Sequence, residues 1–191
     1  MKTIAIPAEL QGMPVVASVS GGKDSTALLI ALRAAGIPFQ ASFADTGWEA
    51  AETYAFLDFL RDRIGPIETV GHPGGMRAKI AERAAFPTRM ARWCTGELKV
   101  QCLRQVHDRI VEETGLDTVS AVGIRASESE ARSVMPEVED DHEWGGWIWR
   151  PLIDWTIDDV LTAHAEAGVP LNALYRAGHN RVGCYPCIYS G

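Results

Sequence analysis

One short stretch, VVASVSGGKDSTAL from Val15 to Leu28, constrains the fold of this chain more than any other feature. Its first part is small, β-branched and apolar, which predicts a buried strand. Adjacent glycines, Gly21 and Gly22, let the main chain approach a ligand closely. The alanine- and leucine-rich run that follows predicts a helix, whose free N–H groups and positive dipole end point back at the turn. The pattern predicts a phosphate-binding loop. The alternative is a tight turn with a well-capped helix, because Ser and Asp are favoured cap residues.

The side chains of the loop favour a phosphate site. Lys23 adds a point charge, and the hydroxyls of Ser20 and Ser25 donate hydrogen bonds. Asp24 is a candidate ligand for a magnesium ion held against the phosphates. The glycine spacing of a Walker A loop is absent, which excludes that class of nucleotide site.

Alternating strand and helix patterns continue along the chain and predict one α/β domain over residues 1–191. The predicted strands are 14–20, 38–44, 66–70 and 116–124, and the predicted helices are 26–35, 48–64, 76–86, about 93–114 and 157–167. Strands separated by such helices form a doubly wound, mostly parallel sheet with helices on both faces. Ligands bind beyond the carboxyl ends of such strands, where the loop, Asp45-Thr46-Gly47 and the residues after Ile124 fall.

The segment 125–149 is polar, acidic and rich in tryptophan, and it shows no periodicity. It is too long for a plain connector, so we expect either a mobile lid over the site or a surface that packs on a partner.

The formal net charge of −7 argues against broad nonspecific nucleic-acid binding, although it leaves room for a local basic cleft. No apolar run approaches the length of a membrane span, and the first residues lack a signal-peptide core. We therefore expect a cytoplasmic protein with no membrane partner. Cysteines in such a compartment are metal-binding, catalytic or buried more often than they form disulfides.

The four cysteines divide into two motifs. Cys184 and Cys187 form a Cys-x-x-Cys pair, and Cys94 lies beside the basic residues Arg92 and Lys99 at the start of a helix, an arrangement that binds anions and lowers a thiol pKa. Spacing alone leaves zinc, an iron–sulfur cluster and a redox dithiol open.

Cys102 is the remaining cysteine. In a continuous helix, Cys94 and Cys102 lie about 12 Å apart along the axis, which is too far for neighbouring ligands of one compact cluster. Cys102 also shares an apolar face with Leu103, Val106 and Ile110. We therefore expect Cys102 to be a core residue rather than a metal ligand.

A third candidate segment runs from Gly123 to Arg132, after a predicted strand end. Arg125 and Arg132 are suited to clamp phosphate or sulfate. The alternative is a pair of surface salt bridges with Glu128 and Glu130.

The loop SGGKDS after a hydrophobic strand resembles the pyrophosphate-binding loop of the adenine nucleotide α-hydrolase superfamily. The later segments GIRASESEAR, RPLIDWT and PLNALY resemble the PAPS reductase family, so the resemblance extends from Val15 to Cys187. It implies an adenine nucleotide as ligand, and it implies that Asp45 and Thr46 border the adenosine pocket.

The cysteine pattern is similar to that of iron–sulfur adenylyl-sulfate reductases, which carry a tandem Cys-Cys. Their first cysteine falls on Cys94, their second on Thr95 and a later proline on Cys102. The resemblance implies a 4Fe-4S cluster held by Cys94, Cys184 and Cys187, with one iron open to sulfide or substrate. The pattern is also similar to PAPS-reductase-like proteins of DNA phosphorothioation systems.

Two departures separate the branches of the family. The reductases carry Ser-Phe-Gly where this chain has Ser20-Gly21-Gly22, and their tail bears a nucleophilic cysteine, whereas no cysteine follows Cys187 in this sequence.

We therefore expect an ATP pyrophosphatase-type sulfurtransferase that uses Mg2+ and ATP, with Lys23, Asp24 and Lys99 as catalytic residues. Sulfur would come from a donor protein or sulfide, and the acceptor would be a nucleic acid or a small molecule. The alternatives are a PAPS or adenylyl-sulfate reductase and a non-catalytic iron–sulfur or zinc nucleotide-binding subunit. A homo-oligomer or a place in a larger complex is compatible with each.

Overall fold

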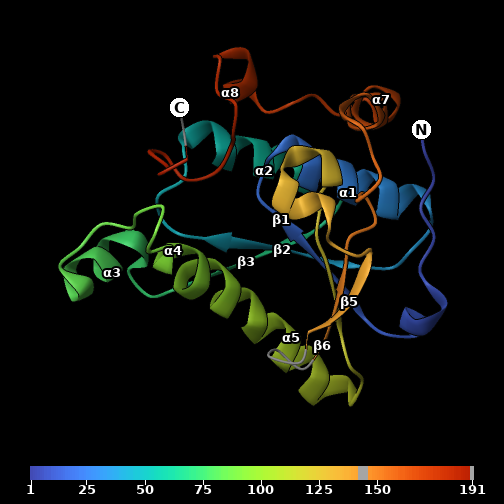
Figure 1. Cartoon of the computed structure of the whole chain (residues 1–191), viewed down its shortest axis with the longest axis horizontal. Coiled ribbons are helices and arrows are strands. Elements are labelled where there is room, and N and C mark those ends of the chain that lie inside the picture. Colours follow the sequence, from blue (N-terminus) through green and yellow to red (C-terminus); the bar gives the residue numbers. More distant parts are fainter. Residues whose placement is uncertain (142–145, 190–191) are drawn as a thin grey trace.

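A six-stranded sheet forms the centre of the computed structural model, which describes residues 1–141 and 146–189 (Figure 1). The strand order is β3-β2-β1-β4-β6-β5. The bounds are β1 (Val15–Val19), β2 (Gln40–Asp45), β3 (Ile67–Gly71), β4 (Val119–Ala121), β5 (Val138–Asp141) and β6 (Gly146–Trp149). Neighbouring strands pair in parallel except β5, which pairs antiparallel with β6. The predicted doubly wound, mostly parallel sheet is confirmed.

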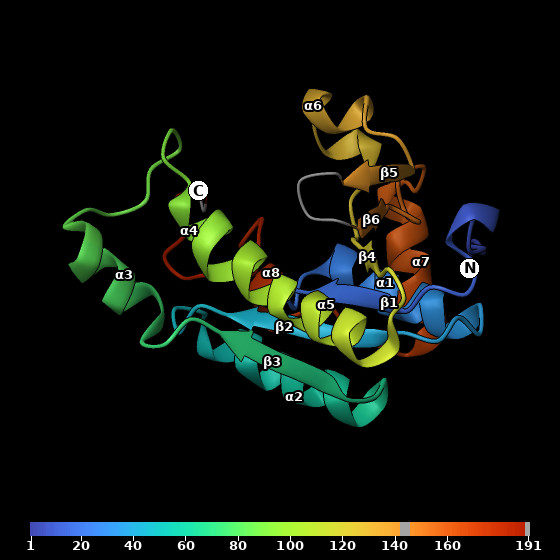
Figure 2. The ribbon, with the colours of Figure 1, turned by 90° about the horizontal axis from the view of Figure 1, so that it is seen from below.

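Helices cover both faces of this sheet. The longer ones are α1 (Lys23–Ala34), α2 (Ala51–Arg63), α3 (Gly75–Arg83), α5 (Gln101–Thr114) and α7 (Ile157–Ala167). Shorter turns are η1 (Ala8–Leu10), α4 (Trp93–Thr95), η2 (Gly96–Val100), η3 (Ala126–Glu128), α6 (Glu130–Ser133) and α8 (Ala173–Arg176). Helices α1 and α2 lie on one face with α7 packed against α1, and α5 crosses the other face (Figures 1 and 2).

Helix α1 is buried over nearly its whole circumference. Its residues from Ser25 to Leu32 are all buried, because the sheet lies on one side of the helix and α7 on another. A helix that is apolar all round belongs inside a fold. The loop that leads into α1 is therefore attached to a helix whose middle is buried in the core.

Strand β1 marks the point where the strand order reverses. The chain adds β2 and β3 on one side of β1 and β4 on the other. The loops that leave β1 and β4 therefore diverge and leave a crevice between them, which is where open α/β sheets bind ligands.

The expectation for residues 125–149 is corrected by the sheet. Val138–Asp141 and Gly146–Trp149 form β5 and β6, and Trp149 is fully buried. Residues 142–145 of the expected lid lie outside the described residues. Two four-residue strands are too short to show a period, and the acidic side chains of β5 are those of an edge strand that avoids further pairing.

Several predicted boundaries move. The predicted helix from about residue 93 is present as α4, a π-helical turn η2, and α5 in succession. Strand β4 is shorter than predicted, because the chain beyond it turns towards α1. The predicted Thr156 cap of α7 is confirmed: its Oγ1 accepts a hydrogen bond from the Asp159 backbone N at 3.1 Å. Across the residues that the structure describes, no helix combines the length and the apolarity needed to cross a membrane.

Candidate functional site

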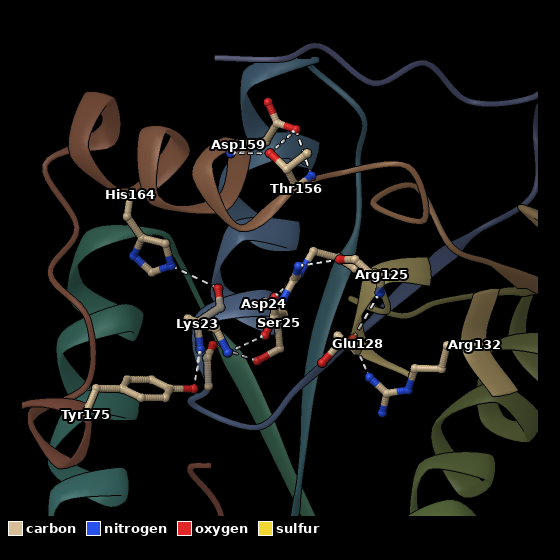
Figure 3. Close-up of polar contacts among 12 residues, drawn as sticks. Lys23, Asp24, Ser25, Arg125, Glu128, Arg132, Thr156, Asp159, His164 and Tyr175 are labelled. Atoms are coloured by element: carbon tan, nitrogen blue, oxygen red, sulfur yellow. Dashed lines mark hydrogen bonds and ion pairs between the residues drawn. The ribbon is translucent and has the colours of Figure 1, made fainter. Parts of the chain in front are cut away.

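A cavity of about 800 Å³ occupies the crevice between the loop after β1 and the segment after β4. Figure 3 shows part of its wall, with Lys23, Asp24 and Ser25 from α1, Glu128 from η3, Arg132 from α6 and Tyr175 from α8. Most of the residues predicted to bind a nucleotide line it: Ser20, Gly22, Lys23, Asp24, Ser25, Gly123, Arg125 and Arg132. Residues a hundred positions apart in the sequence are thus brought to one hollow.

The loop is shaped by its own hydrogen bonds. Gly21 has φ of +72°, and a β-carbon there would lie 3.1 Å from Thr53 Cγ2. Ser25 Oγ accepts a hydrogen bond from the Ser20 backbone N at 3.2 Å and donates one to the Gly22 carbonyl at 3.1 Å. The hydroxyl proton of Ser25 is therefore used inside the loop, and this residue shapes the turn.

Two later helices hold Lys23, the first residue of α1. Its backbone N donates to the Tyr175 phenol oxygen at 3.1 Å, and its Nζ lies 5.3 Å from the centre of the same ring. Its carbonyl oxygen lies 2.9 Å from His164 Nε2 (Figure 3). Burial raises the pKa of Tyr175, so the phenol stays protonated near neutral pH. A free N–H at the start of a helix is a phosphate donor, and here the phenol occupies it.

Asp24 joins the two main cations of the cavity. Its Oδ1 lies 2.6 Å from Arg125 Nε, and its Oδ2 lies 3.1 Å from Lys23 Nζ. Arg125 is only 6% exposed and also donates from NH1 to Ser127 Oγ at 2.9 Å. Charges fixed in this way need little rearrangement when an anion arrives.

Gly123 allows the contact between Arg125 and Asp24 to form. A β-carbon on Gly123 would lie 2.7 Å from the Asp24 carbonyl oxygen, closer than atoms approach. The segment after β4 can therefore press against the first turn of α1 only with glycine at this position. That approach brings Arg125 to Asp24.

The carboxylates that line the cavity do not form an open magnesium site. Asp24 already contacts two cations, as described above. Glu128 accepts a hydrogen bond from the Arg125 backbone N at 3.0 Å and pairs with Arg132. A divalent cation placed here would face three basic side chains. The arrangement does not fit Mg2+ held by Asp24, and we assign no magnesium ligand.

The second candidate region, the cysteine pocket, is a hollow of about 310 Å³ lined by Cys94, Cys184 and Cys187. The C-terminal segment runs beside α4 in both views, which brings Cys94 near the Cys-x-x-Cys pair (Figures 1 and 2). The other lining residues are mostly apolar: Trp48, Met76, Ile80, Phe86, Pro87, Pro186 and Ile188.

Cys184 contacts the segment that follows β2. Its Sγ donates to Glu49 Oε1 at 3.4 Å and lies 3.6 Å from Thr46 Oγ1. Burial raises the pKa of the Cys184 thiol, while the charge of Lys99 acts in the opposite direction. Thr46 Oγ1 itself donates to Glu49 at 2.8 Å. Thr46 is thus in contact with the cysteine pocket, and neither it nor Asp45 is among the residues that line the large cavity.

The donor set of the pocket consists of three thiols. They meet around an apolar hollow, and thiolates are the usual ligands of iron–sulfur clusters. Within residues 1–141 and 146–189, no three Cys, His, Asp or Glu side chains are arranged to hold a single metal ion. Thiolates bind zinc as well as iron–sulfur clusters, so this donor set by itself leaves both metals open.

Cys102 lies apart from this pocket. It is 2% exposed on α5, and its Sγ donates to the Glu97 carbonyl at 3.7 Å. Val106 and Ile110, on the same face of the helix, are also buried. This position is that of a core residue.

Lys99 lies next to the cysteines. It belongs to the π-helical turn η2 and lines a small hollow of about 90 Å³ with Cys184 and Cys187. Arg181 and Val182 line this hollow and also the large cavity. The small hollow therefore links the two candidate regions, and π-helical turns are frequent at functional sites.

A family profile described as the phosphoadenosine phosphosulfate reductase domain matches residues 14–190. The chain belongs to this family. The match contains the loop, Arg125 and Arg132, and all four cysteines.

Relatives within and around this PAPS reductase family differ in length. An uncharacterized 37.8 kDa protein of Escherichia phage 186 is 32% identical over 92% of this chain and 67% of its own length. An adenosine 5′-phosphosulfate reductase of Burkholderia cepacia is 31% identical over 82% of this chain. The chain spans 62% of that reductase, and only 36% of an uncharacterized relative from Methanocaldococcus jannaschii.

Solved structures share the fold. A PAPS reductase from Candida auris, in a phosphate complex, superposes with a TM-score of 0.71 at 18% identity, covering 94% of this chain and 85% of that one. A U34-tRNA thiolase from Methanococcus maripaludis with its [4Fe-4S] cluster gives a TM-score of 0.58 at 16% identity, covering 94% of this chain and 61% of that one.

Sequence reasoning missed three polar residues in this PAPS reductase fold. Tyr175 and His164 hold Lys23, and Glu49 contacts Cys184. Tyr175 lies in the segment PLNALY that carries the family resemblance, which was a signal for its importance. His164 and Glu49 lie in ordinary helix and turn patterns, and only the tertiary structure reveals their partners.

Proposed function

We propose that the chain is an ATP-dependent enzyme that adenylates an acceptor and supports replacement of the adenylate by sulfur. The observation that carries this proposal is that one short segment forms a wall of both candidate regions. Asn180, Arg181 and Val182 line the large cavity, and Cys184 and Cys187 line the cysteine pocket. An intermediate made in the first region is thus only a few residues from the second.

The large cavity is suited to the adenylation step. An oxygen of the acceptor would attack the α-phosphorus of ATP, the bond to the β-phosphate would break, and pyrophosphate would leave. Lys23, Arg125 and the N–H groups at the start of α1 provide positive charge where pyrophosphate gains negative charge. The contacts of Asp24 keep both cations in place before the nucleotide binds.

The sulfur step belongs to the cysteine pocket. A sulfide equivalent would attack the activated carbon of the acceptor, and AMP would leave with the acceptor oxygen. A 4Fe-4S cluster held by Cys94, Cys184 and Cys187 would supply an iron with an open position for sulfide. Lys99, beside Cys184 and Cys187, would hold anionic sulfur near the shared wall. The apolar walls would exclude the water that hydrolyses the adenylate.

ATP is favoured as the nucleotide because Ser20-Gly21-Gly22 resembles the form of the loop in enzymes that cleave ATP itself. The resemblance places the phenylalanine of the reductases at Gly21. Here φ is +72° and a β-carbon would press on Thr53, so the backbone is shaped for glycine.

The second candidate function is reduction of adenylyl sulfate or PAPS. It is supported by the 31% identity to the Burkholderia cepacia reductase. The same basic cavity would then hold the phosphosulfate group.

Titration of the anaerobically purified protein with ATP, followed by a pyrophosphate-release assay, tests the proposal. The Lys23→Ala variant is expected to bind ATP about tenfold more weakly or worse, since a hydrogen bond to a charged group contributes roughly 1.5 to 3 kcal/mol. Lys2→Ala, which removes an exposed lysine on another part of the chain, is the matched control. Wild-type protein that does not bind ATP but releases sulfite from adenylyl sulfate, with an added dithiol as the two-electron reductant, would establish the second function instead.

A further inference from the structure

Three arginines surround one tyrosine at the edge of the large cavity. The guanidinium carbons of Arg89, Arg92 and Arg181 lie 5.7, 5.1 and 5.2 Å from the centre of the Tyr189 ring. We call these four residues the arginine cluster. Its members come from the connection before α4 and from the C-terminal segment, so the fold assembles the cluster.

No carboxylate of the described residues forms an ion pair with the cluster. Among residues 1–141 and 146–189, its hydrogen bonds are weak contacts with neutral oxygens: Arg89 Nε donates to the Ile188 carbonyl at 3.4 Å, and Arg92 to Thr95 Oγ1 at 3.4 Å. All three arginines are exposed. Three like charges gathered in one place repel one another, so a bound polyanion would relieve this repulsion.

The position of the cluster connects it with the acceptor. Arg92, Arg181 and Tyr189 line the same cavity as the phosphate loop. Lys23 and Arg125 are engaged at the loop through Asp24, whereas the cluster lies on the C-terminal wall. An anion bound there would be a second one, held apart from the pyrophosphate group of the nucleotide.

Exposed apolar side chains accompany the charges. Met90, between two of the arginines, is 98% exposed, and Tyr185 is 56% exposed and packs edge-on against His179. A basic groove interleaved with aromatic and apolar side chains is the usual surface for single-stranded nucleic acid, because phosphates contact the cations while bases stack. Because the chain as a whole carries a formal net charge of −7, a local concentration of arginines indicates a surface that binds an anion.

We propose that the arginine cluster binds the phosphate backbone of a single-stranded nucleic acid, which is the acceptor. The strand passes over Arg89, Arg92 and Arg181 and presents a base to the cavity. This substrate class rests on the proposed function, but the binding surface is measurable without any catalysis.

Fluorescence anisotropy with a labelled single-stranded oligonucleotide of mixed sequence, as RNA and as DNA, tests the surface over a range of salt concentrations. Each phosphate contact contributes about 0.7 to the slope of log affinity against log salt for a single strand. The triple variant Arg89→Ala, Arg92→Ala, Arg181→Ala is therefore expected to bind more weakly and to lose about 2 from this slope. The triple lysine variant keeps the charge and is expected to keep the slope. Arg109→Ala removes an exposed arginine of α5 that pairs with Glu68 of β3, and it is the control for loss of an arginine outside the cluster.

The same variants are titrated with ATP and with adenosine 3′,5′-bisphosphate. If the alanine variant loses affinity for these nucleotides while its oligonucleotide affinity and slope match the wild type, the cluster serves a nucleotide phosphate and the inference is wrong. Equal slopes for all proteins, or no oligonucleotide binding by the wild type, also overturn it. Failure of the wild type to bind ATP overturns the proposed function alone, because the anisotropy result does not depend on ATP.

Discussion

Asp24 organises the nucleotide wall at the scale of single residues. Its two carboxylate oxygens contact Arg125 and Lys23, and Gly123 permits the backbone approach that makes the first contact possible. The sequence pattern assigned Asp24 to magnesium, because an acid beside a phosphate loop has that role in many sites. The structure places it between two cations, so its first effect is to orient positive charge.

The Tyr175 phenol occupies a donor that a phosphate oxygen would use. Tyr175→Phe keeps the ring under Lys23 but removes the acceptor of the Lys23 N–H. We expect the ligand-free protein to lose about 1 kcal/mol of unfolding free energy, the usual contribution of one hydrogen bond. The ATP complex is expected to lose less, because a phosphate oxygen then accepts from the same N–H.

Urea unfolding with and without saturating ATP measures both values. Tyr54→Phe is the control, because it removes a phenol contact to Asp45 away from the cavity. It should lower the free energy of unfolding by the same amount with and without ATP. An equal loss in both states for Tyr175→Phe would show that the phenol keeps its place when the nucleotide binds.

At the scale of elements, local signals decided what the sequence predicted correctly. The β1 strand, the glycine turn and α1 were recognisable because residue types change sharply at each boundary. The Thr156 cap was recognisable because Asp159 follows three residues later. Strands β5 and β6 were missed because their four residues each acquire a strand conformation only by pairing with β4 and with each other.

In the candidate site, too, residues with a local sequence signal were predicted and contacts between distant segments were missed. Residues in local motifs, such as Lys23 and Arg125, were predicted and line the large cavity. The arginine cluster and the contact between Glu49 and Cys184 join distant segments, and no single stretch of sequence carries them.

Helix α5 contacts the residue before β4 through His107, which gives the stability of the fold a pH dependence. His107 Nδ1 lies 2.7 Å from Thr118 Oγ1, and burial lowers the pKa of His107 below its ordinary value of 6.5. Between the folded pKa and 6.5 the unfolded chain binds more protons than the folded one, so stability rises with pH in that window. We expect unfolding free energy to be lost as pH falls below about 6.5.

Chemical unfolding of the wild type and of His107→Gln at pH 7.5 and pH 5.5 measures this contribution. Glutamine does not titrate and keeps a polar group near Thr118, so the variant is expected to lose less stability between the two pH values. Parallel losses in the two proteins would assign the pH dependence to other groups.

For the whole molecule, the central relationship is that two chemically different regions share one wall. The large cavity offers basic groups, and the cysteine pocket offers thiols in an apolar setting. The segment from Asn180 to Cys187 borders both.

Anaerobic purification followed by iron, sulfide and zinc analysis tests the metal content of the cysteine pocket. Cys94→Ala, Cys184→Ala and Cys187→Ala are each expected to lose iron, against about four irons per chain in a protein with a cubane cluster. Cys102→Ala is the control and should retain it, because Cys102 is buried on α5. Stoichiometric zinc in the wild type, or loss of iron in the control, would contradict the assignment.

The contact between Lys23 and Tyr175 also determines when the loop can complete its folding during synthesis. These residues are 152 positions apart, and His164 follows Lys23 by 141. At synthesis rates of about 5 to 20 residues per second, the loop leaves the ribosome roughly 7 to 30 seconds before its supports exist. The first turn of α1 therefore reaches its final form only after the segment from His164 to Tyr175 has been synthesised and has folded against it.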